Sequence, residues 1–218
     1  MHLYLDTADR AAAEPLLATG LFAGVTTNPT ILQRAALNVS DIPGIYEWAV
    51  AAGAREVFFQ AWGEDPATLI ERGQRLRDLG SEVVVKLVAS RAGSSACAEL
   101  AARGIPTLLT AVYAPAQAIV AAAAGATYIA PYLGKLQDAG RDAMADITAM
   151  HEILAATGSH TKVLLASIRE VPAIVALAHH GVKHFTMGPA VADQFFADEL
   201  TADAVRTFEA AVLGASSG

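Results

Sequence analysis

Short apolar runs alternate along the chain with longer segments whose apolar residues recur at helical spacing. The short runs predict eight strands, at residues 3–5, 22–25, 56–60, 83–88, 106–111, 127–130, 162–166 and 184–187. The longer segments predict helices at residues 8–18, 41–52, from 64 onward, 91–102, 114–124, 142–156, 171–179, 190–196 and 202–213, with a short helix after Pro29. Thr7 is expected to cap the first of these helices.

The regular alternation of strand and helix predicts an α/β fold. Eight units over 218 residues leave about 27 residues for each strand and its crossover helix, which is enough for a parallel pair. We therefore expect a single-domain (β/α)8 TIM barrel over residues 1–218, with a C-terminal helix at about 199–213 and a tail at 214–218. A doubly wound open sheet is the alternative, but no glycine-rich dinucleotide fingerprint follows the first strand.

Composition narrows the classes of function. Apolar residues make up 54% of the chain and charged residues 17%, which suits a globular core. The net charge of −7 argues against general nucleic-acid binding. No apolar run reaches the roughly 18 residues of a membrane span, and the first residues lack the layout of a signal peptide. We expect a cytoplasmic protein without membrane contact, in which the single Cys97 is a packing residue.

Lys86 is the residue whose position demands an explanation. It lies inside the β-branched run Val83–Val88, which reads as a buried strand. Burial disfavours the charged ammonium and lowers its pKa, and a neutral amine can attack a carbonyl to form a Schiff base. The alternative is a lysine at a strand edge that extends to water.

Polar residues follow the predicted strands, where barrels of this kind carry their chemistry. In chain order they are Asp6, Thr26, Thr27, Asn28, Gln60, Trp62, Lys86, Ser90, Thr110, Tyr132, Ser167 and Arg169. Any one of them could be a helix cap or a loop residue. Their shared position on one rim favours a site.

A central lysine suggests roles for its neighbours. Asp6 can move protons at a substrate oxygen, and Asn28 can bind a hydroxyl or position Lys86. The strand-end residues Gln60, Thr110 and Tyr132 can together hold one water. An imine at Lys86 is itself the electron sink for breaking a neighbouring carbon–carbon bond, so no metal or organic cofactor is expected.

Three further residues suit a phosphate group. Ser167 is expected to lead a helix start, where backbone N–H groups favour anions. Lys135 and Arg169 would supply positive charge. The alternative for both cations is an ordinary solvated surface position.

The chain resembles the small-subunit transaldolase family, which includes the fructose-6-phosphate aldolases. The resemblance rests on the ordered motifs Leu3-Tyr4-Leu5-Asp6-Thr7, Gly24-Val25-Thr26-Thr27-Asn28-Pro29-Thr30, Val84-Val85-Lys86, Gly104-Ile105-Pro106-Thr107-Leu108, Thr110-Ala111-Val112-Tyr113, Ala130-Pro131-Tyr132 and Leu165-Ala166-Ser167. It implies a class I aldolase barrel with Lys86 as the Schiff-base lysine and Asp6 as the acid/base. Gln60 and Tyr132 resemble the aldolase branch, whereas transaldolases usually have glutamate and phenylalanine there.

The resemblance implies reversible cleavage of fructose 6-phosphate to dihydroxyacetone and glyceraldehyde 3-phosphate, or aldol addition of dihydroxyacetone-type donors to aldehydes. Transfer of a dihydroxyacetone unit between sugar phosphates, as in transaldolase, is the alternative. The chain departs from the family pattern at Leu87-Val88-Ala89-Ser90, where Pro-x-Thr usually follows the lysine, and at Lys135, which replaces an arginine. The bulky Trp62 is expected to narrow the donor pocket.

Assembly is a further implication of the resemblance. Members of the family form pentamers and decamers in which a C-terminal helix reaches a neighbour, so a homo-oligomer is expected. The segment Leu200 to Leu213 would make that contact, or it would instead cover its own barrel.

Three other functions fit the sequence less well than the aldolase. A non-catalytic sugar-phosphate-binding barrel has little need of Lys86, Asp6 and Tyr132 together. A deoxyribose-phosphate aldolase needs a second lysine beside the first, and no other lysine has such a setting. A metal site at His179, His180 and His184 is not expected, because adjacent helical side chains point about 100° apart and no carboxylate is spaced with them.

Overall fold

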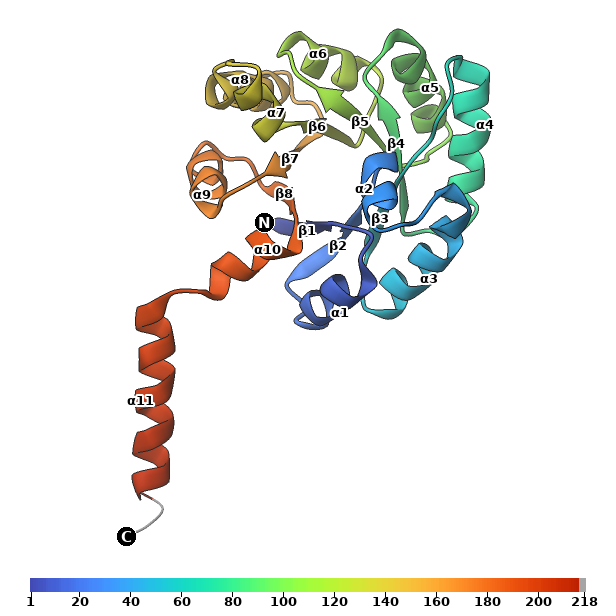
Figure 1. The fold of residues 1–218 in the computed structure, drawn as a ribbon. Helices are drawn as coiled ribbons and strands as arrows, with labels where there is room; N and C mark the ends of the chain where they lie inside the picture. The colour runs from blue at the N-terminus through green and yellow to red at the C-terminus, as the bar shows by residue number, and fades with distance from the viewer. Residues whose placement is uncertain (216–218) are drawn as a thin grey trace.

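Eight parallel strands form a closed barrel in chain order in the computed structural model, which describes residues 1–215 (Figure 1). The strands are β1 (His2–Asp6), β2 (Phe22–Thr26), β3 (Glu56–Gln60), β4 (Val83–Val88), β5 (Thr107–Val112), β6 (Tyr128–Pro131), β7 (Lys162–Ile168) and β8 (His184–Met187). Each strand pairs with its sequence neighbour, and β8 closes the ring against β1. The predicted barrel is confirmed, and the open-sheet alternative is wrong.

Helices surround the barrel, as the crossover rule for parallel strands requires. They are α1 (Arg10–Ala18), α2 (Pro29–Arg34), α3 (Ile42–Ala51), α4 (Pro66–Arg77), α5 (Arg91–Ala102), α6 (Ala116–Ala123), α7 (Leu133–Asp138), α8 (Ala143–Ala156), α9 (Val171–His179), α10 (Pro189–Asp193) and α11 (Glu199–Ala215), with 3-10 turns η1 (Val39–Asp41) and η2 (Gln194–Phe196). No helix in this described part of the chain combines the length and apolarity that crossing a membrane requires.

The cap of the first helix differs from the prediction. Helix α1 begins at Arg10, and the side chain of Asp9 accepts a hydrogen bond from the backbone N–H of Ala12 at 3.2 Å. The hydroxyl of Thr7 instead accepts from the N–H of Asp9 at 3.0 Å. Thr7 therefore stabilises the loop that leads to the cap, and Asp9 is the cap itself.

Helix α7 was not predicted, because its six residues are too few to show a helical period and they include Gly134. The glycine has a packing reason. A Cβ built on it would lie 2.8 Å from the backbone oxygen of Ser167 and 2.9 Å from Nε of Arg169. Only glycine allows α7 to approach the end of β7 this closely.

The alternation of side chains along each strand divides the core in two. On β4, Val83, Val85 and Leu87 point outward and pack under the helices. Val84 points inward and joins the barrel interior. Lys86 lies two positions after Val84 and therefore shares the inner face.

Three aromatic rings fill the interior of the barrel. The rings of Tyr4 and Phe58 meet edge to face with centroids 5.3 Å apart, and Phe58 and Tyr128 lie 5.4 Å apart. Both tyrosine hydroxyls donate to the carboxylate of Glu56, at 2.5 Å from Tyr4 and 2.9 Å from Tyr128. We call Tyr4, Phe58 and Tyr128 the aromatic plug, because they close the barrel to passage along its axis.

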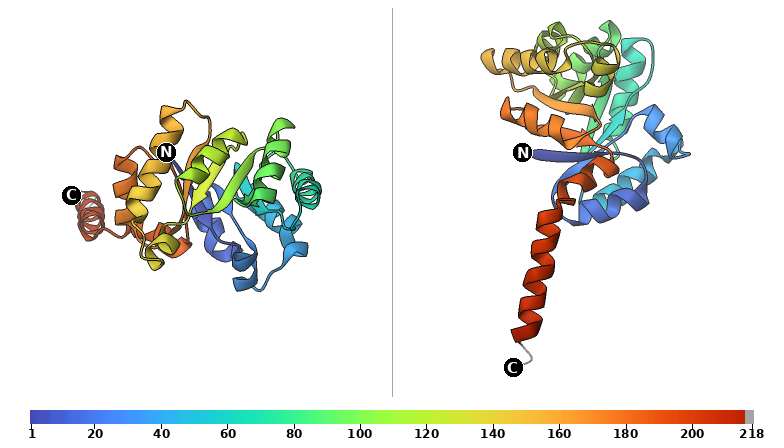
Figure 2. Two further views of the ribbon diagram at one scale, coloured as in Figure 1. Left: turned by 90° about the horizontal axis from the view of Figure 1, so that it is seen from above. Right: turned by 60° about the vertical axis from the view of Figure 1, so that its left-hand side comes forward.

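Helix α11 extends away from the barrel (Figures 1 and 2). It exposes large apolar side chains, with Leu200 79% and Phe208 68% accessible. The helix predicted at 199–213 is thus present, and the alternative that it covers its own barrel is wrong. The helix continues through Ala215, two residues into the predicted tail, and residues 216–218 lie outside the described residues.

Candidate active site

Above the aromatic plug, the inner face of the barrel is lined by polar side chains. Interior residues of five strands are each followed, two positions later, by a predicted site residue. The pairs are Tyr4 and Asp6, Phe58 and Gln60, Val84 and Lys86, Leu108 and Thr110, and Ala130 and Tyr132. Strand period alone therefore brings these five side chains to one end of the barrel.

Lys86 is buried, with 4% of its surface accessible. Its ammonium donates a hydrogen bond to the backbone oxygen of Thr27 at 2.7 Å. Burial lowers the pKa of Lys86, and the negative charge of Asp6 opposes that shift. The amine therefore loses its proton more readily than a surface lysine does.

Asp6 ends β1 and is held by a chain of hydroxyls. The hydroxyl of Thr26 donates to Oδ1 of Asp6 at 2.6 Å and lies 2.6 Å from the hydroxyl of Thr186. Burial raises the pKa of Asp6, although Lys86 and Thr26 both favour its ionised form. Burial thus favours the neutral form of both Asp6 and Lys86, which suits groups that exchange protons during a reaction.

Tyr132 and Thr110 form a second polar pair. Their hydroxyl oxygens lie 2.7 Å apart, and burial raises the pKa of Tyr132, so the phenol keeps its proton. Gln60 lies opposite Lys86 in the register of β3 and β4. Gln60 and Tyr132 line the cavity described next, whereas Thr110 is behind its lining and fixes Tyr132.

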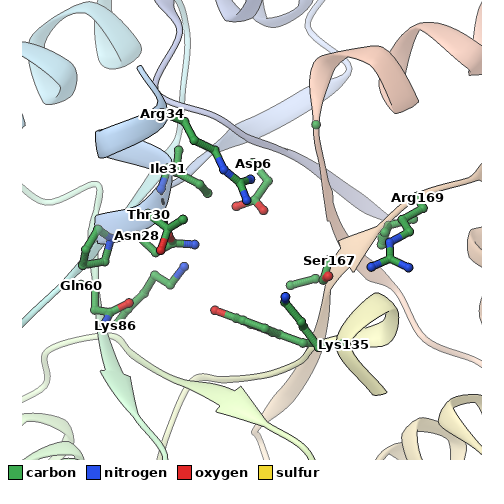
Figure 3. Close-up of a pocket in the computed structure, with 15 residues that line it drawn as sticks. Asp6, Asn28, Thr30, Ile31, Arg34, Gln60, Lys86, Lys135, Ser167 and Arg169 are labelled. Carbon is green, nitrogen blue, oxygen red and sulfur yellow. Dashed lines mark hydrogen bonds between the residues drawn. The ribbon is translucent and has the colours of Figure 1, made fainter. Parts of the chain in front are cut away.

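A cavity of about 580 Å³ opens above Lys86 (Figure 3). Among its lining residues are Asp6, Asn28, Thr30, Arg34, Gln60, Lys86, Tyr132, Lys135, Ser167, Arg169 and Gly188. The side-chain oxygen of Asn28 accepts from the N–H of Ile31 at 3.0 Å and so caps α2. Within residues 1–215 its amide N–H groups donate no hydrogen bond, and Asn28 is one of the residues that line the cavity.

The predicted phosphate residues lie together across the cavity from Lys86 (Figure 3). Lys135 comes from α7, and Ser167 and Arg169 come from the end of β7 and the loop after it. The prediction that Ser167 leads a helix start is wrong: it is a left-handed residue (φ 58°) at an irregularity in the pairing of β7 with β8, and α9 begins only at Val171. Arg169 already donates two hydrogen bonds to Asp138, at 2.7 and 2.8 Å.

Comparison with known proteins identifies the family. A family model described as "Transaldolase/Fructose-6-phosphate aldolase" matches residues 3–216. The chain belongs to the transaldolase/fructose-6-phosphate aldolase family. It is therefore similar throughout its length to enzymes of the transaldolase or aldolase type, and the predicted resemblance is confirmed.

Individual proteins similar to this family member support the same family assignment. A "Probable transaldolase" of Phenylobacterium zucineum is 36% identical over 212 residues, covering 95% of this chain and 94% of the relative. A "Probable transaldolase" of Coprothermobacter proteolyticus is 35% identical over 92% of this chain and 91% of the relative. Among solved structures, a mandelate oxidase with benzoyl-formic acid superposes with a TM-score of 0.58 at 17% identity over 87% of this chain, which spans 64% of that longer chain. That likeness concerns the barrel fold alone.

One predicted site residue of this transaldolase-family chain lies elsewhere. Trp62 lines a separate cavity of about 270 Å³ against α3 and α4. The guanidinium of Arg72 lies 4.7 Å from the centre of its ring and donates to its backbone oxygen at 2.6 Å. The expectation that Trp62 narrows the donor pocket is therefore wrong, because its side chain packs on α4.

Three polar residues of the family member's site were not predicted from sequence: Thr30, Arg34 and Thr186. Arg34 lines the cavity from α2, and its positive charge opposes the rise that burial causes in the pKa of Asp6. Thr30 and Arg34 are one helical turn apart, so the period of α2 could have indicated Arg34. The hydroxyl of Thr186 lies within hydrogen-bonding distance of that of Thr26, and a hydroxyl inside the buried strand β8 was the available signal.

The histidine trio does not form a cluster. His179 and His180 are exposed at the end of α9, whereas His184 is buried at the opposite end of the barrel from Lys86. Within residues 1–215, no three His, Cys, Asp or Glu side chains gather closely enough to hold a metal ion. The thiol of Cys97 is buried, 3.2 Å from the hydroxyl of Thr107, in keeping with a packing role.

Proposed function

We propose that the chain is a class I aldolase that forms a Schiff base through Lys86. Its proposed reaction is the reversible cleavage of fructose 6-phosphate to dihydroxyacetone and glyceraldehyde 3-phosphate. The observation that carries this proposal is the buried amine of Lys86 in a cavity that Asp6 and Tyr132 also line. A desolvated lysine of lowered pKa is the form of amine that attacks a ketone.

The first half of the reaction uses Lys86 and Asp6. The amine attacks the C2 carbonyl, and loss of water gives an iminium ion. As the C3–C4 bond breaks, its electron pair moves into the iminium and forms an enamine. The proton of the C4 hydroxyl passes to the carboxylate of Asp6, whose raised pKa makes it a better base than an exposed aspartate.

The second half separates an aldolase from a transaldolase. An aldolase protonates the enamine at C3 and hydrolyses the resulting iminium to release dihydroxyacetone. The neutral hydroxyl of Tyr132, fixed by Thr110, and the amide of Gln60 are suited to hold the water that delivers this proton. The aldolase reading therefore rests on Tyr132 and Gln60.

The other end of the cavity suits the phosphate of the substrate. Lys135, Ser167 and Arg169 supply positive charge and a hydroxyl there, and Asn28 offers its amide to a sugar hydroxyl. Asp138 shares the guanidinium of Arg169, so Lys135 is the more available cation.

Transaldolase activity is the second candidate, and the names of the similar proteins favour it. In that reaction the enamine on Lys86 waits for a second aldehyde. Protonation by water would then be slow compared with capture of the acceptor.

The deciding experiment supplies fructose 6-phosphate to the purified protein without an acceptor and measures free dihydroxyacetone. Steady release supports the aldolase, and turnover only after an aldose acceptor is added supports the transaldolase. Borohydride reduction during turnover, followed by peptide mass spectrometry, should place the adduct on Lys86. Absence of any adduct together with tight sugar-phosphate binding would instead indicate a non-catalytic binding barrel.

A further inference from the structure

A second polar cavity lies at the opposite end of the barrel from Lys86. It measures about 370 Å³, within the size range of small-molecule sites. Its polar lining comes from the starts of β7 and β8 and from around the end of α8: His151, Ser159, Thr161, Lys162, Lys183 and His184. The aromatic plug separates it from the site around Lys86.

The charge of this cavity contrasts with that of the chain. The protein has 22 acidic and 15 basic residues, yet the described residues that line this cavity include two lysines, two histidines and no carboxylate. Burial lowers the pKa of His2 and His151, and the charges of Glu56 and Glu152 oppose that shift, but neither glutamate lines the cavity. The cavity is therefore a local positive field in an acidic protein.

His184 offers an unused hydrogen-bonding group to the cavity. Only 8% of its surface is accessible, and its ring stacks on that of His2 with centroids 4.7 Å apart. Burial and the charges of His2 and Lys162 lower the pKa of His184 to about 3, so it is a neutral imidazole with one N–H donor at pH 7. In the described part of the chain, every fully buried side-chain nitrogen or oxygen has a partner. Since the ring of His184 has no hydrogen bond there, its nitrogens keep some accessible surface, and His184 is one of the residues that line the cavity.

The ends of two helices lie beside the cavity, but no hydrogen bond ties the two lysines to them. Helix C-termini attract positive charge, and both α8 and α9 end here. The N–H of Ser159 already bonds the oxygen of Leu154, and the N–H of Val182 bonds that of Leu177. Among residues 1–215, the ammonium groups of the two lysines make no hydrogen bond or ion pair, although that of Lys162 lies 5.4 Å from the centre of the Tyr128 ring. Both can therefore donate to an anionic ligand.

We propose that this cavity binds a phosphate group, free or on a small metabolite, between Lys162, Lys183 and His184. Lysines act as point charges toward phosphate, and the neutral imidazole of His184 and the hydroxyl of Ser159 add donors. The site is distinct from the phosphate residues beside Lys86, and it does not depend on the function proposed above.

The test uses the full-length protein with 15N-labelled histidine. Inorganic phosphate is titrated at constant ionic strength while the ring signals of His151 and His184 are recorded, with chloride as the comparison salt. Phosphate should shift both signals saturably, and the double variant K162Q/K183Q should bind at least about tenfold more weakly, because charge-assisted hydrogen bonds are lost. The matched control K135Q removes a lysine from the other end of the barrel and should leave these shifts unchanged.

The results distinguish free phosphate from a phosphorylated metabolite as the ligand, and they include outcomes that would contradict the proposal. Tighter binding of glycerol phosphate than of inorganic phosphate identifies a metabolite as the ligand, and equal binding identifies free phosphate. Far-UV circular dichroism checks that K162Q/K183Q is folded. Histidine shifts that are absent, equal with chloride, or retained in a folded K162Q/K183Q would overturn the proposal.

Discussion

The hydroxyl oxygens of Thr110 and Tyr132 lie 2.7 Å apart, and of the two residues only Tyr132 lines the cavity above Lys86. Thr110 thus sets the direction of the phenol from behind. In the mechanism proposed above, the hydroxyl of Tyr132 is the group that separates the two candidate activities.

Replacing Tyr132 by phenylalanine should move the activity from aldolase toward transaldolase. Acceptor-independent release of dihydroxyacetone should fall on the order of a hundredfold, as expected when a proton-transfer group is lost. Transfer to an added aldose should persist or increase. The matched control is Tyr113→Phe, because that ring lies edge-on to Tyr132 at 5.9 Å. Unchanged release in Tyr132→Phe would remove the phenol from the mechanism.

Replacing Lys86 by methionine should abolish the borohydride-trapped adduct. Cleavage should fall by about a thousandfold or more, since the covalent route is lost. The control variant Lys135→Met retains Lys86 and should still form the adduct. Peptide mass spectrometry reads both results, and an adduct persisting in Lys86→Met would assign the imine to another lysine.

The pH dependence of imine formation should respond to Asp6. Burial lowers the pKa of Lys86, and the anion of Asp6 raises it. Imine formation with dihydroxyacetone should therefore slow as the pH falls and the amine becomes protonated. Asp6→Asn removes the anion, so the pKa of Lys86 falls further and the acid limb moves to lower pH. Asp9→Asn changes an aspartate at the cap of α1 and should leave the limb in place. A limb that moves to higher pH in Asp6→Asn would contradict this coupling.

Lys135→Met should weaken the use of phosphorylated substrates selectively. The loss of a charge-assisted contact predicts an increase in KM for fructose 6-phosphate of about tenfold or more. Addition of dihydroxyacetone to unphosphorylated glyceraldehyde should change little. Steady-state kinetics with the paired substrates provides the comparison, and equal losses on both would place Lys135 outside the phosphate site.

Helix α11 is proposed to join copies of the chain into a homo-oligomer. Its exposed Leu200, Val205 and Phe208 have no place on the barrel of their own chain. Phe208→Asp should therefore lower the molar mass measured by light scattering, because burying an unpaired charge in an apolar contact is costly. Glu209→Gln alters the adjacent exposed position as a control. A monomeric parent protein, or an unchanged mass in Phe208→Asp, would argue against this role.

The barrel and most of its polar rim could be predicted from the sequence for one physical reason. Side chains alternate between the two faces of a strand, so the residue two positions after an interior residue also points inward. Lys86 therefore shares the inner face with Val84. The same rule located Asp6, Gln60 and Tyr132. The position of each depends on its own strand and on little else.

Features that depend on contacts between distant elements were not predictable in this way. Trp62 follows β3 as a site residue would, but Arg72 on α4 holds it outside. Helix α7 forms where packing against Ser167 favours a glycine, so local propensity gives no sign of it. Arg34 is a different case, because its position depends on the local cap at Asn28 and on the period of α2, which strand period does not describe.

The aromatic plug has a consequence for the path by which molecules reach Lys86. Because Tyr4, Phe58 and Tyr128 fill the barrel beneath the lysine, substrate and products should enter and leave through the same opening of the cavity. In the proposed aldolase reaction, the dihydroxyacetone fragment stays bonded to Lys86 after the C3–C4 bond breaks, so the covalent bond itself makes the aldehyde leave first. What the plug adds is a shared path: released dihydroxyacetone should leave by the route along which the ketose arrives, and the two should compete directly.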